Sequence, residues 1–295
     1  MRNDRLNNKR TIMNKRILIP TDFSENSVNA IHYAVALYGH TECDFHIMHS
    51  YYLAGESKDN LLIPEPDKGD YKAVRETSEK NVEILKEKIS PKNEGSNHKF
   101  HFSSVQGPLL DTIKNKVKKE KIDLIVMGTR GQNDAENLAF GSAAVSVMEN
   151  VRSCPVLAIP RNTPFEKPNE IVFPTGFNTR YKPEELECLV KIAQLTEAPV
   201  RILYISKGEA LSKRQVEKKK VLENALADVD YSHHNLYNVP VKTGVRCFVQ
   251  SRESGMIAFV NKKHFLFGSI FSDPMVKQIG RFANVPLFAM HDVRE

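Results

Sequence analysis

The segment that decides the fold is Arg16–Ser24, which reads RILIPTDFS, because a variant of it returns at Glu170–Asn178 as EIVFPTGFN. Each copy is a short apolar run that ends in Pro-Thr and is followed by a turn and then by residues with helical spacing. In the first copy this spacing is carried by Ala30, Ala34 and Leu37. The opening strand, turn and helix are therefore written twice in one chain.

The later strands and helices also recur in the same order. The further expected strands are residues 44–52, 99–107, 123–128 and 154–160 in the first half and 199–207, 233–240, 255–260 and 285–291 in the second. Strands that alternate with helices imply right-handed crossovers and a parallel sheet covered on both faces. We therefore predict an α/β protein with two tandem domains, residues 1–162 and 163–295, each an open parallel five-stranded sheet with helices on both faces.

The composition predicts a soluble globular chain, with 295 residues, 41% hydrophobic and 26% charged. The formal net charge of +6 raises the question of anionic partners. The lysines fall mostly on amphipathic helical stretches without a DNA- or RNA-binding signature, so we expect no nucleic-acid partner. No apolar run approaches the ~20 residues of a membrane span. Residues 1–16 lack the apolar segment of a secretory signal, so we expect a cytoplasmic protein without a membrane partner.

Cysteines and histidines give no sign of a metal site. The four cysteines are scattered singly, which is typical of reduced, mostly buried thiols: Cys43, Cys154, Cys188 and Cys247. His46 and His49 are three residues apart in a strand-like run, so we expect them on opposite faces of the sheet. We predict no metal bound by protein side chains.

The loop Gly128–Ser142 reads GTRGQNDAENLAFGS and follows an apolar strand. In a parallel α/β sheet, ligands bind at the carboxyl ends of the strands. Gly128 and Gly131 would allow positive φ and let a phosphate approach backbone N–H groups. Gly141 and Ser142 would open a helix whose N-terminus favours anions. Alternatively, the glycines only turn the loop and Ser142 only caps the helix; the combined spacing G-x2-G-x9-G-S favours a phosphate site.

This spacing resembles the universal stress protein family, specifically its ATP-binding branch, which carries G-x2-G-x9-G-[S/T]. The opening ILIPTDFSENS and the strand PVLAIP are similar to the family's first and last strands. The resemblance covers the first half nearly end to end and the second half more weakly. It implies two tandem, Rossmann-like universal stress protein domains. It also implies ATP or a related adenine nucleotide, with magnesium held through the phosphates.

In the family, the ends of the first and second strands hold adenine and ribose. The nucleotide-binding residues that the resemblance implies are Pro20, Thr21, Asp22, Ser50, Met127, Gly128, Arg130, Gly131, Gly141, Ser142 and Ala143. The Asp22 carboxylate can accept hydrogen bonds from ribose hydroxyls or the adenine amino group. Asp22 can instead contribute to the N-cap of the following helix. Arg130 can reach a phosphate or remain solvated.

The second half departs from this pattern. Gly176 replaces Asp22, and Phe259–Ser269 reads FVNKKHFLFGS, which keeps only the final Gly268 and Ser269 of the motif. Asn261, Lys262 and Lys263 bring side chains to the positions of the early glycines. We interpret this half as degenerate for ATP; the lysines and His264 either bind another anion or belong to a solvated loop.

The sequence therefore predicts a cytoplasmic stress-response regulatory protein that binds ATP, or a related adenine nucleotide, in its first half. The alternative is a protein-interaction module of the same family that binds no nucleotide. No Walker sequence is present and no catalytic residue is identified, so we expect at most slow ATP hydrolysis. The resemblance further implies antiparallel pairing of the last strands, 154–160 and 285–291, as an intramolecular pseudo-dimer. The sequence leaves open whether the chain forms a homodimer and which protein partner it binds.

Overall fold

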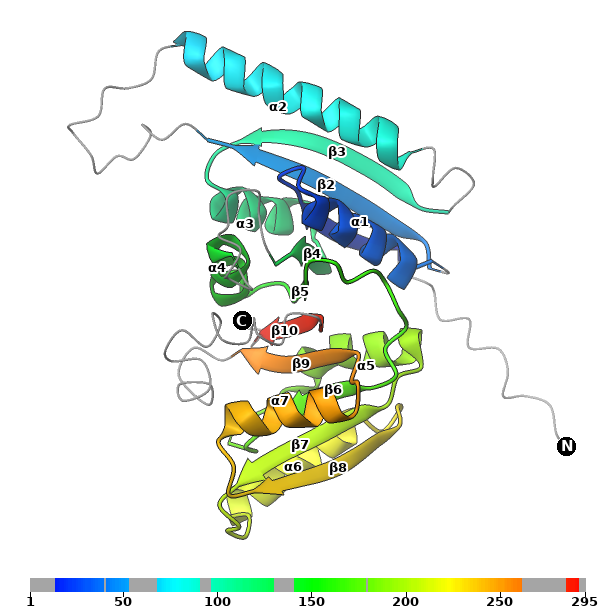
Figure 1. Ribbon diagram of the computed structural model, residues 1–295, viewed down its shortest axis with the longest axis vertical. Coiled ribbons are helices and arrows are strands. Elements are labelled where there is room, and N and C mark those ends of the chain that lie inside the picture. The colour runs from blue at the N-terminus through cyan, green and yellow to red at the C-terminus, as the bar shows by residue number, and fades with distance from the viewer. Residues whose placement is uncertain are drawn as a thin grey trace, which may run out of the picture.

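The computed structural model describes residues 14–39, 41–52, 68–90, 97–129, 141–178, 180–261 and 285–291 (Figure 1). The first half contains β1 (Lys15–Pro20), α1 (Glu25–Leu37), β2 (Cys43–Tyr51), α2 (Lys68–Ile89), β3 (Lys99–Gln106), α3 (Leu109–Glu120), β4 (Leu124–Gly128), α4 (Ser142–Asn150) and β5 (Val156–Ile159). The second half contains β6 (Ile171–Pro174), α5 (Pro183–Thr196), β7 (Val200–Ser206), α6 (Lys213–Ala225), β8 (Tyr231–Tyr237), α7 (Val241–Ser251), β9 (Met256–Asn261) and β10 (Leu287–His291). The strands expected from the sequence are all present.

The strands of the described residues form one ten-stranded sheet in the order β3-β2-β1-β4-β5-β10-β9-β6-β7-β8. All pairs within each half are parallel, as predicted. The halves meet where β5 and β10 pair antiparallel, with Ala158 opposite Leu287 (Figure 1). The predicted pairing of the last strands is thus confirmed, and neither strand is left as an open edge. The boundary between residues 162 and 163 stays a prediction.

Successive side chains of each strand point to opposite sides of the sheet. Both faces of the sheet are therefore apolar, and helices cover each of them. Ile17 and Ile19 lie in the core formed with α1, α2, α5 and α6, whereas Leu18 lies in the core formed with α3, α4 and α7. On α1, Ala30 and Ala34 are buried as their spacing predicts. None of the described helices has both the length and the apolar character that a membrane crossing requires.

The same turn follows β1 and β6. The hydroxyl oxygen of Thr21 accepts a hydrogen bond from the N–H of Phe23 at 3.0 Å, and Thr175 accepts one from Phe177 at 2.9 Å. Both phenylalanines have positive φ, 65° and 53°, which is uncommon for bulky side chains. The threonine hydroxyls therefore hold a strained turn that directs the chain toward α1 and α5.

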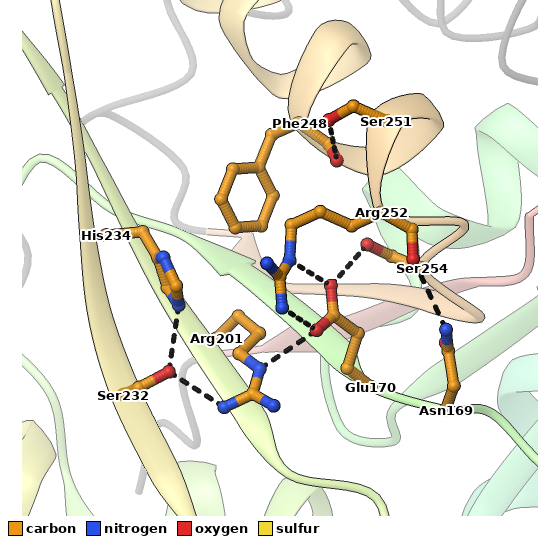
Figure 2. A network of polar contacts seen from close by, with 9 residues as sticks. All are labelled: Asn169, Glu170, Arg201, Ser232, His234, Phe248, Ser251, Arg252 and Ser254. Atoms are coloured by element: carbon orange, nitrogen blue, oxygen red, sulfur yellow. Dashed lines mark hydrogen bonds and ion pairs between the residues drawn. The ribbon is translucent and has the colours of Figure 1, made fainter.

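Glu170, directly before β6, ties the end of α7 to the amino edge of the sheet (Figure 2). Its carboxylate accepts two hydrogen bonds from Arg252, at 2.8 and 2.6 Å. It also accepts one from Arg201 at 2.9 Å and one from Ser254 at 2.7 Å. The Arg252 guanidinium lies 5.2 Å from the ring centroid of Phe248. Burial by itself would raise the pKa of Glu170, but hydrogen bonds from Arg252, the serine and the other arginine outweigh it and lower the pKa to about 2.

The described cysteines are free thiols in different surroundings. Cys43 and Cys154 are buried, Cys188 is partly buried and Cys247 is exposed. Burial raises the pKa of the Cys43 thiol to about 12. The expectation of mostly buried thiols is therefore met at Cys43 and Cys154, while Cys247 lies on the outer surface of α7.

His46 and His49 lie on opposite faces of the sheet, as predicted. His46 stacks on His101 of the neighbouring strand, with ring centroids 4.8 Å apart. His49 instead reaches α2, where its Nδ1 lies 2.7 Å from Ser78 Oγ. The described residues contain no group of three or more His, Cys, Asp or Glu side chains that could hold a metal ion.

Candidate functional site

A cavity of about 250 Å³ lies at the carboxyl ends of β1, β2 and β4, beside the N-terminus of α4. It is lined by most of the residues that the sequence assigned to nucleotide binding: Pro20, Thr21, Asp22, Ser50, Met127, Gly128 and Ala143. Gly141 and Ser142 directly precede Ala143 at the start of α4. Arg130 and Gly131 lie outside the described residues. The fold thus brings residues from distant parts of the first half to one place.

Thr21 borders the cavity, but its hydroxyl is used by the turn after β1. Besides accepting from Phe23, it lies 2.8 Å from the hydroxyl oxygen of Ser27. Ser27 donates its own hydroxyl proton to the carbonyl of Ser24, so Thr21 must be the donor to Ser27. Thr21 therefore borders the cavity with a hydroxyl that has two partners in the turn, and its contact with a nucleotide stays a prediction.

Asp22 lines the cavity and also supports the N-cap of α1. Its Oδ1 accepts hydrogen bonds from the N–H and the hydroxyl of Ser24, at 3.1 and 2.6 Å. Ser24 is the N-cap residue, and its side chain accepts from the N–H of Ser27. The capping role considered for Asp22 is thus indirect. A carboxylate has about four acceptor positions, so Asp22 can support the helix and still accept from a ligand.

Gly128 is needed for close packing rather than for a turn. Among the described glycines, only Gly107 and Gly208 have positive φ, so the expectation of positive φ at Gly128 is wrong. A Cβ placed on Gly128 would lie 2.7 Å from Nδ2 and 3.0 Å from Cγ of Asn26. The side chain is absent because α1 approaches the end of β4 at this point. The same absence leaves backbone exposed to the cavity.

The N-terminus of α4 lies beside the cavity, and no side chain of the described residues caps it. Gly141 is the N-cap residue, so the alternative in which Ser142 caps the helix is wrong. Ser142 and Ala143 are exposed, and Ala143 lines the cavity. The first N–H groups of a helix have no acceptor within the helix and favour negative charge. This end of α4 can therefore receive an anionic group.

His49 belongs to the cavity wall, although the sequence gave it no role in this site. Its ring centroid lies 4.5 Å from that of Phe23. Burial lowers the pKa of His49, and the nearby Asp22 carboxylate opposes this shift. His49 and Asp22 also border a second cavity of about 610 Å³ alongside α2. The two cavities therefore adjoin at these two side chains.

Thr129 also lines the cavity, and the sequence treated it only as a spacer in the glycine motif. The residue is 1% exposed. Its N–H donates to the carbonyl of Ile159 at 2.9 Å, and its carbonyl accepts from the N–H of Gly141 at 2.6 Å. Its hydroxyl has no hydrogen-bond partner among the described residues. Buried hydroxyls are almost always hydrogen-bonded, so this one requires an explanation. Its position at the carboxyl end of a buried strand was the signal that could have identified it.

The corresponding positions of the second half carry different side chains. Strand register places Gly176, Ile205 and Val260 where the first half has an aspartate, a serine and a glycine. Val260 is buried. Ile205 packs closely on Gly244: a Cβ placed on Gly244 would lie 2.7 Å from Cδ1 of Ile205. The loop residues singled out in the sequence, Lys262, Lys263, His264, Gly268 and Ser269, lie outside the described residues.

Asn261 links the two halves. The sequence indicated this residue only as one that replaces an early glycine of the motif. Its Nδ2 donates to the carbonyl of Met148 at 2.9 Å. Its own carbonyl accepts from Nη1 of Arg152, also at 2.9 Å. Met148 belongs to α4 and Arg152 follows that helix. The side chain of Asn261 is thus used at the junction with the first half.

The chain is similar to known proteins in sequence and in fold. Residues 13–160 match the family model described as the Universal stress protein family. Universal stress protein MJ0531 of Methanocaldococcus jannaschii is 31% identical over 146 residues, which are 49% of this chain and 81% of the relative. The crystal structure of a universal stress protein from Archaeoglobus fulgidus DSM 4304 is 19% identical, with a TM-score of 0.67, over 93% of this chain and 95% of that chain. The crystal structure of a universal stress protein in complex with cAMP is 16% identical, with a TM-score of 0.34, over 49% of this chain and 96% of that chain. The cAMP is bound to that protein.

Proposed function

Because the chain belongs to the universal stress protein family, we propose that its first half binds an adenine nucleotide, ATP or a close relative, in a stress-response regulatory protein. The observation that carries the proposal is the meeting of Asp22, Ser50 and Ala143 around one cavity beside the N-terminus of α4. Ligands of parallel α/β sheets bind at this edge, outside the carboxyl ends of the strands.

The groups around the cavity suit the parts of an adenine nucleotide. Asp22 and Ser50 provide oxygen atoms that can hydrogen-bond ribose hydroxyls or the adenine amino group. The uncapped start of α4, at Ser142 and Ala143, suits phosphates. Drug-sized ligands occupy sites of about 300–1,000 Å³. The cavity of about 250 Å³ opens beside the one of about 610 Å³, so the two together provide enough volume.

Magnesium would enter the site with the nucleotide and offset the charge of its phosphates. The described residues hold no cluster of metal-ligating side chains, so we assign the ion to phosphate oxygens and water. The chain's own contribution is to bind and orient the nucleotide. We assign no catalytic residue, and the proposed role is regulatory binding in the cytoplasm.

We propose that the second half is structural and offers a surface to a protein partner. Gly176 brings no carboxylate to the position of Asp22, and Ile205 and Val260 are apolar where the first half has a serine and a glycine. These replacements remove hydrogen-bonding groups and add bulk. One nucleotide per chain is therefore the expected occupancy.

A charge placed at the start of α4 tests the site without damaging the helix. In Ala143→Glu, the exposed carboxylate stabilises the helix N-terminus by about 0.3–1 kcal/mol but repels phosphates. Ala143→Gln adds similar bulk without charge. Saturation of wild type with Mg-ATP at 100-fold above Kd should add about 2.7 kcal/mol to its unfolding free energy. The glutamine variant should keep this gain, and the glutamate variant should lose it.

Thermal unfolding of nucleotide-free protein with and without Mg-ATP measures these gains. Mass spectrometry of the native protein would identify any nucleotide that it carries. A wild type whose unfolding is indifferent to Mg-ATP would favour the interaction module without nucleotide. Equal ATP stabilisation of the glutamate variant and the wild type would show that phosphates do not bind at α4.

A further inference from the structure

Two threonines in the wall of the cavity differ in how their hydroxyls are hydrogen-bonded. The Thr21 hydroxyl accepts from Phe23 and bonds to Ser27, so it is satisfied within the protein. The Thr129 hydroxyl is buried and has no partner in the described part of the chain. Both backbone groups of Thr129 are paired. The hydroxyl is therefore the group of Thr129 that a ligand could satisfy.

The position of Thr129 indicates which part of a ligand it would meet. Its carbonyl accepts from the N–H of Gly141, the N-cap of α4, so Thr129 lies against the start of that helix. The free N–H groups of the helix favour an anion at this point. A threonine hydroxyl adds one O–H donor, and hydrogen bonds to an ionised oxygen are the stronger kind.

We propose that the Thr129 hydroxyl is a ligand-binding group that donates a hydrogen bond to a phosphate oxygen of the nucleotide. The assignment rests on the proposed function. It adds a phosphate contact from the residue between the first two glycines of the motif. The phosphate would then be the partner that this hydroxyl lacks among the described residues.

The test compares the same substitution at the two threonines. Thr129→Val keeps the branched shape and removes the hydroxyl, whereas Thr129→Ser keeps the hydroxyl. Isothermal titration of nucleotide-free protein should show ATP affinity about ten- to a hundredfold weaker for Thr129→Val than for wild type. Adenosine affinity should be unchanged, and Thr129→Ser should bind ATP nearly as wild type does.

The melting temperature of nucleotide-free protein distinguishes a ligand-binding hydroxyl from a structural one. Thr129→Val should melt at or above the wild-type temperature, because it removes a buried hydroxyl that has no partner in the part of the chain that the structure describes. Thr21→Val should melt lower, because it removes two bonds of the turn.

Three results would overturn the assignment. A lower melting temperature for Thr129→Val would show that the hydroxyl is already bonded within the protein. ATP affinity equal to wild type would show that it does not meet the ligand, and equal losses for ATP and adenosine would exclude the phosphate as its partner. Absence of ATP binding by the wild type would instead refute the proposed function, and the assignment with it.

Discussion

Acid should destabilise the chain through Glu170, and the structure gives the size of the effect. The pKa of this carboxyl falls from its ordinary 4.5 to about 2 in the folded state. Each pKa unit corresponds to 1.36 kcal/mol, so the ionised Glu170 contributes about 3 kcal/mol. Because the folded-state pKa is the lower one, this stabilisation is complete above pH 4.5 and is lost as the pH falls toward 2.

Glu170→Gln removes the charge and nearly preserves the shape. Breaking a buried ion pair from one side costs about 3–5 kcal/mol. The side chains of Arg201 and Arg252 are 24% and 37% exposed, so water can partly replace the lost carboxylate. We therefore expect a loss near the lower end of this range at pH 7. Near pH 2 the wild-type carboxyl is about half protonated in the folded state and most of its contribution to stability is lost, so the difference between wild type and variant should shrink.

Urea unfolding of both proteins between pH 7 and pH 2 measures this difference. The matched control is Glu187→Gln, which removes an exposed carboxylate paired with Lys191 on α5. Exposed pairs of this kind contribute about 0–1 kcal/mol, so the control should follow the wild type. A difference between wild type and Glu170→Gln that stays constant with pH would refute the lowered pKa and the role given to the network.

Two further predictions concern the cavity and the second half. Gly128→Ala should lower the unfolding free energy by about 1–3 kcal/mol, because its Cβ would lie 2.7 Å from Asn26. The control is Gly39→Ala, whose Cβ meets nothing closer than 3.4 Å. Equal urea midpoints for the two variants would contradict the packing argument. Calorimetric titration of nucleotide-free protein with ATP should give one site per chain. A stoichiometry near two would show that the second half binds nucleotide as well.

The order of elements could be predicted because parallel strands that are buried on both faces have continuous apolar sequences. The run 123–128 became β4, and 154–160 and 285–291 contain the two strands that meet at the centre. The position of the cavity was also predictable. Carboxyl ends of parallel strands share one edge, so Asp22 and Ser50 had to lie near each other once the sheet was recognised.

Contacts that depend on packing could not be predicted in the same way. The reason for Gly128 is the approach of Asn26 from another element, which no local pattern encodes. The sequence showed Glu170 only as the first residue of the repeated segment Glu170–Asn178. Its partners Arg201, Arg252 and Ser254 lie 31, 82 and 84 residues further along the chain. Periodicity describes which face of an element is buried. It does not describe which polar groups of distant elements will pair.

The two halves separate residues that build the fold from residues that can serve a ligand. Both halves keep the Pro-Thr turn with a phenylalanine at positive φ. Each phenylalanine also packs on an aromatic side chain of the next strand: Phe23 on His49 at 4.5 Å, and Phe177 on Tyr204 at 5.3 Å. The turn is thus retained in the half that has lost the carboxylate at Gly176. The Pro-Thr turn therefore belongs to the fold that the two halves share.

Under the proposed function, a difference in nucleotide binding between the halves would come from positions at which their side chains differ. These are the strand-end positions of Asp22, Ser50 and Gly128. The second half has a glycine, an isoleucine and a valine there: Gly176, Ile205 and Val260. The substitutions leave the strands and their register intact. If only the first half binds nucleotide, as proposed, a few side chains at one edge of the sheet account for the difference, while the same sheet joins the two halves through β5 and β10.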